Sequence, residues 1–460
     1  MASLAASTTT RAAGFALIEH SAKGMGNAFA GGGAVAEDAS SVWFNPASMT
    51  RLPDQAQVGA HLIEPTFEFS DSGSTQAGSP AALLAGTRAT DDGGERAVVP
   101  NLYYVRNLIE DRLYFGLALN VPFGLATKYP SDWKGRYHAI ESEIRTFNLN
   151  PSLAWRFNDW LSIGAGVSAQ YIDAKLTSAI DFTAVCASTG TGLEGQLSLP
   201  AGTLSSTCTG IARGPGQGGN DGHTENKADD ISFGYNVGVM VEPDQRTRLT
   251  VGYRSEVNHE LDGKVRFDVP ARIATNATLD AAVRRAFADG GISVAADLPQ
   301  QVAVSAYHRF HERWAIMGDA TWTDWSSIPE LRIVYDNPTT TGDGVAIENL
   351  QWDSAWRLSA GLQHYYNDRV TLRAGFAWDQ SPVHDPTLRT PRLPDNDRWW
   401  IALGGSFELV PRKVSLDVGY ARLEIPDTVI ARSNDTRATL NGTYSSHSDI
   451  LSAQLSWRFD

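Results

Sequence analysis

The stretch "LSIGAGVSAQY" (161–171) indicates the fold class of the chain through the alternation of its residues. Its odd-numbered positions are mainly apolar, whereas its even-numbered positions are serine, glycine and glutamine. Successive side chains of a β-strand point to opposite faces, so this segment would have one apolar face and one small, polar face. The same division recurs at 232–241, 356–363, 370–378 and 414–420. The pattern predicts an all-β protein.

The connections between these segments favour a membrane barrel over a soluble sandwich, which also alternates. Short polar turns, such as those at 158–159 and 367–368, are followed by long connections, such as those at about 174–229 and 264–297. Bacterial outer-membrane barrels combine tight turns at one end with long loops at the other, and they have an even number of strands. We therefore predict an antiparallel transmembrane β-barrel of about 14 strands over residues 54–460.

Charge and hydropathy agree with this class. The chain has 38 Lys and Arg against 52 Asp and Glu, a formal net charge of -14, which argues against a nucleic-acid partner. Its mean hydropathy is -0.24, and it lacks the run of about 18 apolar residues that a membrane helix needs. A barrel strand exposes only every second residue to lipid, so its average stays polar. We expect a multi-pass protein of the outer membrane of a Gram-negative bacterium.

The N-terminal region differs from everything after it. Residues 1–12 have no apolar signal-peptide core, and we interpret them as the remnant of a leader or of cloning. Residues 13–53 are rich in Gly and Ala and follow no strand period. A barrel of about 14 strands is too wide to be filled by its own side chains. The segment 13–53 is therefore predicted to be a hatch, a plug inside the barrel lumen.

The hatch segment also carries a family resemblance. "AGFALIEHSAKGMGNAFAGGGAVAEDASSVWFNPASMTRL" (13–52) resembles the hatch of FadL-type outer-membrane transporters of long-chain fatty acids. The similarity includes the family's Asn-Pro-Ala motif at Asn45, Pro46 and Ala47. Further similar segments extend to the C-terminus; they are "PFGLATKYPSDWKGRY" (122–137), "NLNPSLAW" (148–155), "YRSEV" (253–257), "DLPQQVAVSAYHRFHERWAI" (297–316), "WDQSPV" (378–383) and "LPDNDRWW" (393–400).

The resemblance implies passive transport of a hydrophobic ligand without an energy source. An outer-loop groove would capture the ligand and pass it to an internal pocket. The ligand would then leave sideways into the membrane through a kink in the third strand, at Pro122, Phe123 and Gly124. Lateral exit is physically reasonable, because an acyl chain gains about 0.8 kcal/mol per CH2 on leaving water. Pro lacks a backbone donor and Gly accepts unusual backbone angles, so both suit an interrupted strand.

The same resemblance suggests pocket residues. Phe15 would line the internal pocket, and Asn45-Pro46-Ala47 would hold the hatch in its resting shape. Arg332 occupies the place of a basic pocket residue and is the first candidate to bind a carboxylate headgroup, with Lys175 the second. The family's second pocket arginine has no counterpart here, because Asp173 stands near that place. For both basic residues, a solvated loop charge is the structural alternative.

Three further sets of residues are candidates. Leu279, Val283 and Phe287 share one face of a predicted helix and would form half of the capture groove, or else pack on the barrel rim. Asp379 and Arg398 would pair with each other or brace the hatch.

The last set is the two cysteines. Cys186 and Cys208 lie in one Gly/Ser/Thr-rich connection. A disulfide between them would close a loop of about 23 residues and contribute roughly 3 kcal/mol. We expect it to form because exported loops meet an oxidising compartment, although two unpaired surface thiols are the alternative.

Enzymatic motifs are absent from the sequence. The glycines at 31–33 lack the Lys and Ser/Thr of a phosphate-binding loop, and there is no G-x-S-x-G sequence. We expect no enzyme, no cofactor, no metal and no catalytic residue. The predicted partners are a long-chain fatty acid or another hydrophobic ligand and outer-membrane lipid, with the protein acting as a monomer. The alternatives are an importer of aromatic hydrocarbons or alkanes of the same family, a general porin and a barrel lipase.

Overall fold

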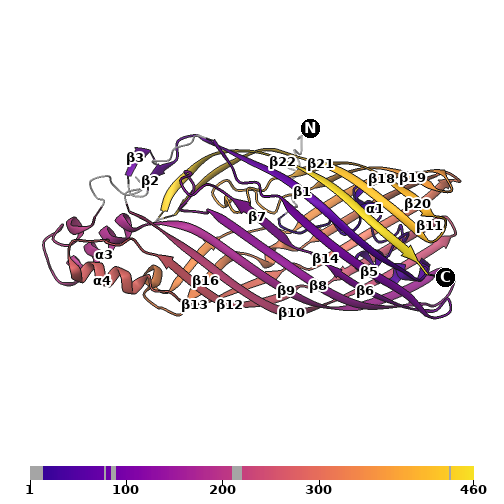
Figure 1. Cartoon of the computed structure of the whole chain (residues 1–460), viewed down its shortest axis with the longest axis horizontal. Helices are drawn as coiled ribbons and strands as arrows, with labels where there is room; N and C mark the ends of the chain where they lie inside the picture. Colours follow the sequence, from indigo (N-terminus) through magenta and orange to yellow (C-terminus); the bar gives the residue numbers. More distant parts are fainter. Residues whose placement is uncertain (1–13, 77–78, 84–89, 210–219, 435–436, 460) are drawn as a thin grey trace, which may run out of the picture.

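The computed structural model of the protein describes residues 14–76, 79–83, 90–209, 220–434 and 437–459. The expected leader remnant, residues 1–12, and the first expected hatch residue, 13, lie outside these ranges. The described chain consists of a hatch, residues 14–53, and a barrel that surrounds it (Figure 1).

The barrel wall consists of antiparallel strands. Its long segments are β1 (Gln55–Asp71), β5 (Ala97–Ile109), β6 (Leu113–Asn120), β7 (Gly124–Lys128), β8 (Glu141–Arg156), β9 (Leu161–Asp181), β10 (Asp221–Asp244), β11 (Thr247–Arg254), β12 (Val257–Asp268), β13 (Gly290–Leu298), β14 (Gln301–His311), β15 (Trp314–Thr323), β16 (Glu330–Tyr335), β17 (Val345–Asn349), β18 (Ala355–Asn367), β19 (Val370–Asp379), β20 (Arg398–Val410), β21 (Val414–Asn434) and β22 (Arg437–Arg458). Three short strands lie beside β1 and β22, namely β2 (Thr75–Gln76), β3 (Ser79–Leu83) and β4 (Thr90–Asp92).

The wall closes where β22 pairs with β1. Five strands of the wall are each made of two consecutive segments: β6 with β7, β11 with β12, β13 with β14, β15 with β16, and β17 with β18. Within the described residues the result is a closed 14-stranded antiparallel barrel, which confirms the predicted fold class.

The period-two pattern sorts side chains between the lipid side and the lumen. On β9, Ile163 and Val167 are exposed on the outer face, whereas Ser162 and Gln170 are buried toward the inside. An apolar outer face is favourable in a bilayer, and the polar inner face contacts the hatch and the lumen. The alternation in the sequence therefore reflects an apolar face toward lipid and a polar face toward the lumen, as predicted.

The strands are longer than the sequence pattern predicted. The expected connection 174–229 is shortened, because β9 and β10 remain paired from Leu161–Val241 up to Asp181–Asp221. The expected connection 264–297 is also shortened, because β12 ends at Asp268 and β13 begins at Gly290. Above the lipid belt the outer face also becomes polar. The alternation signal therefore fades although the ladder of backbone hydrogen bonds continues.

A helical lobe projects from the end of the barrel that carries the long connections (Figure 1). It contains α3 (Phe182–Gln196), the 3-10 turn η2 (Ser205–Thr207) and α4 (Ala277–Ala286). The Cys186–Cys208 disulfide is present in this lobe, as predicted, with 5.8 Å between the Cα atoms. Two further 3-10 turns are η4 (Trp325–Ser327) and η5 (Thr340–Gly342). None of the described helices combines the length and apolar character needed to cross a bilayer.

The hatch occupies the lumen toward the opposite end, where Figure 1 shows α1 enclosed by the wall. Its elements are α1 (Ala22–Met25), α2 (Ser41–Phe44) and η1 (Pro46–Arg51). Two glycines of the wall let the hatch backbone approach closely. A Cβ at Gly375 would lie 2.0 Å from the carbonyl carbon of Asn27, and one at Gly404 would lie 2.6 Å from the Cα atom of Gly26. The glycines on the inner face therefore have a packing role.

Candidate functional site

The base of the hatch, residues 21–50, is attached to the wall by a polar network. The Glu37 carboxylate lies 3.2 Å from the guanidinium of Arg373 and accepts hydrogen bonds from Tyr365 and Gln363. Burial alone would raise the pKa of Glu37, but Arg373, Lys23 and the Tyr365 hydroxyl outweigh it and lower the pKa to about 2. Glu37 is therefore ionised and held at neutral pH.

A second part of the network surrounds α1. The Oγ atom of Ser21 donates to Asp38 at 2.8 Å, and the amide nitrogen of Gln454 donates to the same carboxylate at 3.1 Å. The carbonyl oxygen of the Gln454 side chain accepts the backbone N–H of Ala22 at 2.9 Å. Because these groups are buried, leaving one of them without its partner would cost about 1–3 kcal/mol.

The Asn-Pro-Ala motif connects the hatch to two neighbouring wall strands. The side-chain oxygen of Asn45 accepts the N–H of Ala47 at 3.0 Å, and Pro46 begins η1. The side-chain nitrogen of Asn45 donates to the carbonyl of Val239 on β10 at 3.3 Å and to that of Val251 on β11 at 3.0 Å. This geometry suits the predicted role of the motif, which is to hold the hatch in its resting shape.

The third wall strand is interrupted between β6 and β7. Asn120 still pairs with Asn148 of β8, and pairing resumes at Gly124 with Arg145. Residues 121–123 therefore face only 146–147, which is the arrangement of a β-bulge. The hydroxyl of Thr146 accepts the N–H of residue 123 at 2.9 Å and donates to its carbonyl at 2.8 Å.

The interruption leaves one edge of β5 open. Residues 97–101 of β5 pair with β1, but in the described chain the pairing of β5 with β6 begins only at Leu102 and Leu119. Pro122, Phe123 and Gly124 thus lie at a gap in the ladder, where the sequence predicted the kink.

The first residues of the described chain pass this gap. We call residues 14–20 the strap. The N–H of Leu17 donates to the carbonyl of Pro122 at 2.8 Å, and the N–H of Gly124 donates to the carbonyl of Phe15 at 2.9 Å. At the start of the strap, Gly14 donates to Asp395 at 3.0 Å. The strap thus pairs with the broken strand.

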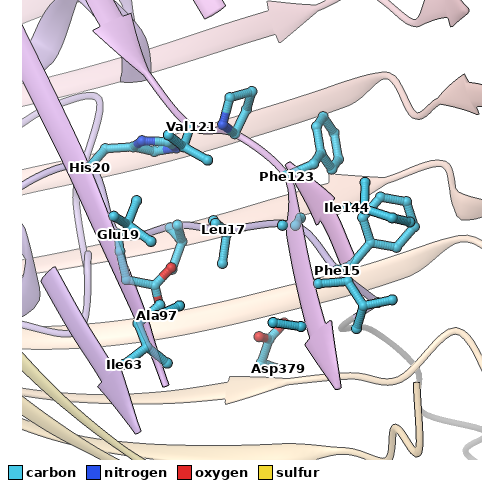
Figure 2. Close-up of a pocket in the computed structure, with 18 of the residues that line it drawn as sticks. Phe15, Leu17, Glu19, His20, Ile63, Ala97, Val121, Phe123, Ile144 and Asp379 are labelled. Atoms are coloured by element: carbon cyan, nitrogen blue, oxygen red, sulfur yellow. The ribbon is translucent and has the colours of Figure 1, made fainter. Parts of the chain in front are cut away.

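A cavity of about 640 Å3 lies between the strap, the gap and β1, and we call it the break cavity. Figure 2 shows Leu17 and Glu19 of the strap within it, with Ile63 and Ala97 on one side and Phe123 on the other. Its lining combines these apolar side chains with many charged ones, among them Glu19, Arg357 and Asp379. Ligand sites likewise combine apolar walls, which take up most of the ligand, with polar groups that orient it.

A second cavity, of about 110 Å3, lies on the other side of Phe15, and we call it the apolar cavity. Its lining is mostly Leu, Ile and Ala and includes Leu125, Ile144 and Leu261. The Phe15 ring lies 5.1 Å from that of Trp325, and Phe15 lines both cavities. The residue predicted to line the internal pocket is therefore placed between two cavities.

The predicted headgroup residues do not reach either cavity, and this corrects their assignment. Arg332 is exposed on the outer face of β16 and lies 2.7 Å from Glu330. Lys175 lies on the outer face of β9, where it contacts Glu141 at 2.7 Å and Glu225 at 3.9 Å. Each of the two side chains occupies a strand position that faces outward, away from the lumen.

The predicted groove residues on α4 also need correction. Leu279 and Val283 are buried against Phe182 and the disulfide, and Phe287 packs partly on the same cluster. They form the interior of the helical lobe and line neither cavity. The amphipathic pattern correctly indicated a buried face, but that face packs against α3.

Several charged residues near the strap were missed or only partly understood. Arg398 lies 3.6 Å from Asp379, and it also donates to the carbonyl of Gly14 at 3.1 Å, so it contacts the hatch directly. Arg357 is buried and lines the break cavity. Its place on the polar face of the 356–363 alternation was a signal, because a charge on that face points into the lumen.

Glu19 is the buried acid of the strap. Burial raises its pKa from 4.5 to about 7, although Arg398 and Arg357 favour the charged form. Among the described residues, no three His, Cys, Asp or Glu side chains come together as a metal-binding cluster.

Comparison with known proteins places this geometry in context. The sequence profile described as "Outer membrane protein transport protein (OMPP1/FadL/TodX)" matches residues 3–459. The long-chain fatty acid transport protein of Escherichia coli (strain K12) is 30% identical over 415 residues, which cover 90% of this chain and 88% of that protein.

Solved structures show the same fold. The crystal structure of a Pseudomonas aeruginosa FadL homologue has a TM-score of 0.82 at 25% identity and covers 97% of this chain and 100% of that one. The Pseudomonas putida toluene transporter TodX has a TM-score of 0.65 at 18% identity, with coverage of 92% and 94%. The second likeness concerns the fold alone.

Proposed function

Because this chain belongs to the family of outer membrane transport proteins that includes OMPP1, FadL and TodX, we propose that it carries long-chain fatty acids passively across the outer membrane. It is an outer-membrane transporter of hydrophobic substrates in a Gram-negative bacterium and not an enzyme. The name of the Escherichia coli relative, a long-chain fatty acid transport protein, supports the choice of substrate.

One observation supports the route best: the break cavity lies directly at the gap between β5 and the interrupted third strand. A ligand taken up by the outer loops would reach the apolar cavity, pass Phe15 and enter the break cavity. It would then leave through the gap into outer-membrane lipid. Each step keeps the acyl chain away from water, which is worth about 0.8 kcal/mol per CH2. One chain contains the whole route, so we propose that it acts as a monomer.

The substitution Gly124→Trp tests lateral exit. A Cβ at this position already lies 2.8 Å from the Leu17 side chain, and an indole would fill the gap. We expect oleate uptake by cells to fall at least tenfold. Gly318→Trp is the matched control, because a Cβ there meets nothing closer than 3.6 Å, at the carbonyl oxygen of Ser359.

The possible results test the exit route and the choice of substrate separately. Unchanged oleate uptake by Gly124→Trp would exclude exit through the gap. Failure of the unsubstituted protein to restore oleate uptake to cells that lack their own transporter would exclude the fatty acid itself.

A small apolar molecule is the second candidate substrate, and the apolar cavity favours it. A cavity with mostly apolar walls can bind an aromatic hydrocarbon without any polar contact. Uptake of labelled toluene in parallel with oleate decides between them. Toluene uptake without oleate uptake would favour the importer of aromatic hydrocarbons or alkanes.

A further inference from the structure

Arg357 has more hydrogen-bond donors than partners. It projects from β18 into the lumen and is only 6% exposed. One terminal nitrogen, Nη2, donates to the carbonyl of Ala28 in the hatch at 2.9 Å. The other two, Nε and Nη1, have no hydrogen-bond partner among the described residues. A buried charged donor without an acceptor is costly, so these two atoms indicate a place where an acceptor binds.

Arg357 also lines the break cavity, together with Glu19 of the strap. Glu19 is itself buried, and its Oε2 atom has no hydrogen-bond partner in the described chain. The structure records no ion pair between these two residues. A cation and a titratable acid thus share one cavity without forming an ion pair in the structure.

The other inward arginines of this cavity have more partners than Arg357, although Nε of Arg398 also lacks a hydrogen bond within the described chain. Arg398 contacts Asp379 at 3.6 Å and Asp395 at 3.5 Å, and it donates to the hatch backbone. Arg254 donates to the carbonyl of Trp43 at 2.8 Å, with its guanidinium 3.3 Å from the centre of that indole ring. Arg357 therefore has the donors best available for a ligand.

We propose that Arg357 binds the carboxylate of the transported fatty acid in the break cavity, and that Glu19 is an internal carboxylate that competes for the same cation. Hydrogen bonds from arginine N–H groups to a carboxylate oxygen are charge-assisted and roughly twice as strong as neutral ones. The acyl chain would lie along Ile63, Val98 and Ile450, which line the cavity beside the gap. This inference rests on the proposed function and adds a specific acid-binding residue to it.

The expected selectivity follows from the unpaired donors. A hydrocarbon of equal length would offer the Arg357 guanidinium no acceptor and an alcohol only a neutral one, whereas a carboxylate would offer it a charged acceptor. Sites that present buried donors discriminate strongly against ligands without the matching acceptors. An ionised Glu19 near the bound carboxylate would weaken it, because like charges repel.

The test compares oleate with oleyl alcohol, which has the same chain and no charge. Dissociation constants are measured at pH 8 on the full-length protein in lipid nanodiscs. In Arg357→Gln we expect oleate affinity to fall at least tenfold, with oleyl alcohol affinity changed less than about threefold. In Glu19→Gln, which keeps the shape of the side chain, we expect oleate affinity to rise and alcohol affinity to stay constant. Lys264→Gln, on the exposed outer face of β12, is the control.

The possible results distinguish a failure of the inference from a failure of the proposed function. An equal loss of oleate and alcohol binding in Arg357→Gln, or an unchanged oleate-to-alcohol ratio in Glu19→Gln, would overturn the inference and leave the transport route intact. Should Arg357→Gln fail to fold, the Glu19→Gln ratio alone decides. Absence of oleate binding in the unsubstituted protein would instead overturn the proposed function on which the inference rests.

Discussion

The base of the hatch and the strap belong to one short segment but are held in different ways. The base, residues 21–50, is fixed by buried side-chain contacts such as Glu37–Arg373 and those of Asn45 with β10 and β11. The strap, residues 14–20, is held mainly by backbone hydrogen bonds to the interrupted strand and has cavities on both sides of Phe15. Because the strap borders both cavities, less of it is packed against neighbouring groups than in the base, and we expect the strap to open before the base.

Removing the hatch would break this comparison most completely. Deletion of residues 14–48 removes both the base and the strap from a lumen that is too wide to fill itself. We expect a steady, large conductance in planar lipid bilayers, where the intact protein stays closed. A deletion variant that folds and remains closed would show that the hatch does not block the barrel.

Disrupting the base alone should have the next largest effect. Arg373→Ala leaves the partly buried Glu37 without its ion-pair partner, and the loss of a hydrogen bond to a charged group costs about 1.5–3 kcal/mol. We expect the backbone amides of residues 21–50 to exchange hydrogen much faster and brief channel openings to occur. Arg369→Ala, in an exposed turn of the same barrel end, is the control. Equal exchange rates in the two variants would contradict the role of the network.

The strap and the base should also differ in how their stability depends on pH. The folded-state pKa of Glu19 is raised from 4.5 to about 7, so its neutral form stabilises the closed strap. This contribution is complete below about pH 4.5 and is lost as the pH rises through 7.

We expect hydrogen exchange of the strap amides, corrected for intrinsic rates, to be on the order of tenfold faster at pH 8.5 than at pH 5.5. The groups facing Glu19 are Arg398 from β20, Arg357 from β18 and Asp379 from β19. Glu19→Gln should remove the pH dependence in the strap and leave the base unaffected. A pH dependence that persists in this variant would assign it to another group.

The smallest effect is expected from Arg332→Ala. Arg332 is exposed on the outer face and pairs with Glu330, and exposed pairs contribute about 0–1 kcal/mol. Oleate binding and uptake should therefore stay within about twofold of the unsubstituted protein. A large, oleate-specific loss would restore Arg332 as a headgroup residue.

The sequence was sufficient for the fold because the bilayer imposes period two on each strand that crosses it. The alternation at 161–171 identifies the lipid face without any knowledge of the neighbouring strands. Beyond the lipid belt this constraint ends, and side chains such as Lys175 and Arg332 can face outward as easily as inward. The sequence therefore gave no reliable sign of their direction.

The candidate site depends on positions far apart in the chain. Phe15 and the break at 122–124 could be predicted, because each shows a local pattern or a family resemblance. The presence of Glu19 and Arg357 in one cavity could not be predicted, because it depends on the strap lying across the lumen beside β18. For α4, the helical period of 3.6 predicted which face is buried. It could not predict that this face packs against α3.

The closure of the barrel also has a consequence for assembly. β1 directly follows the hatch, and all 17 of its residues pair with β22, which is the last strand of the chain. A lateral seam of this kind cannot form before the C-terminal strand has been synthesised. A hatch already in place would be enclosed as this seam forms, whereas a hatch added later would have to enter the completed cylinder through one end. The topology therefore favours an order of assembly in which the barrel closes around the hatch.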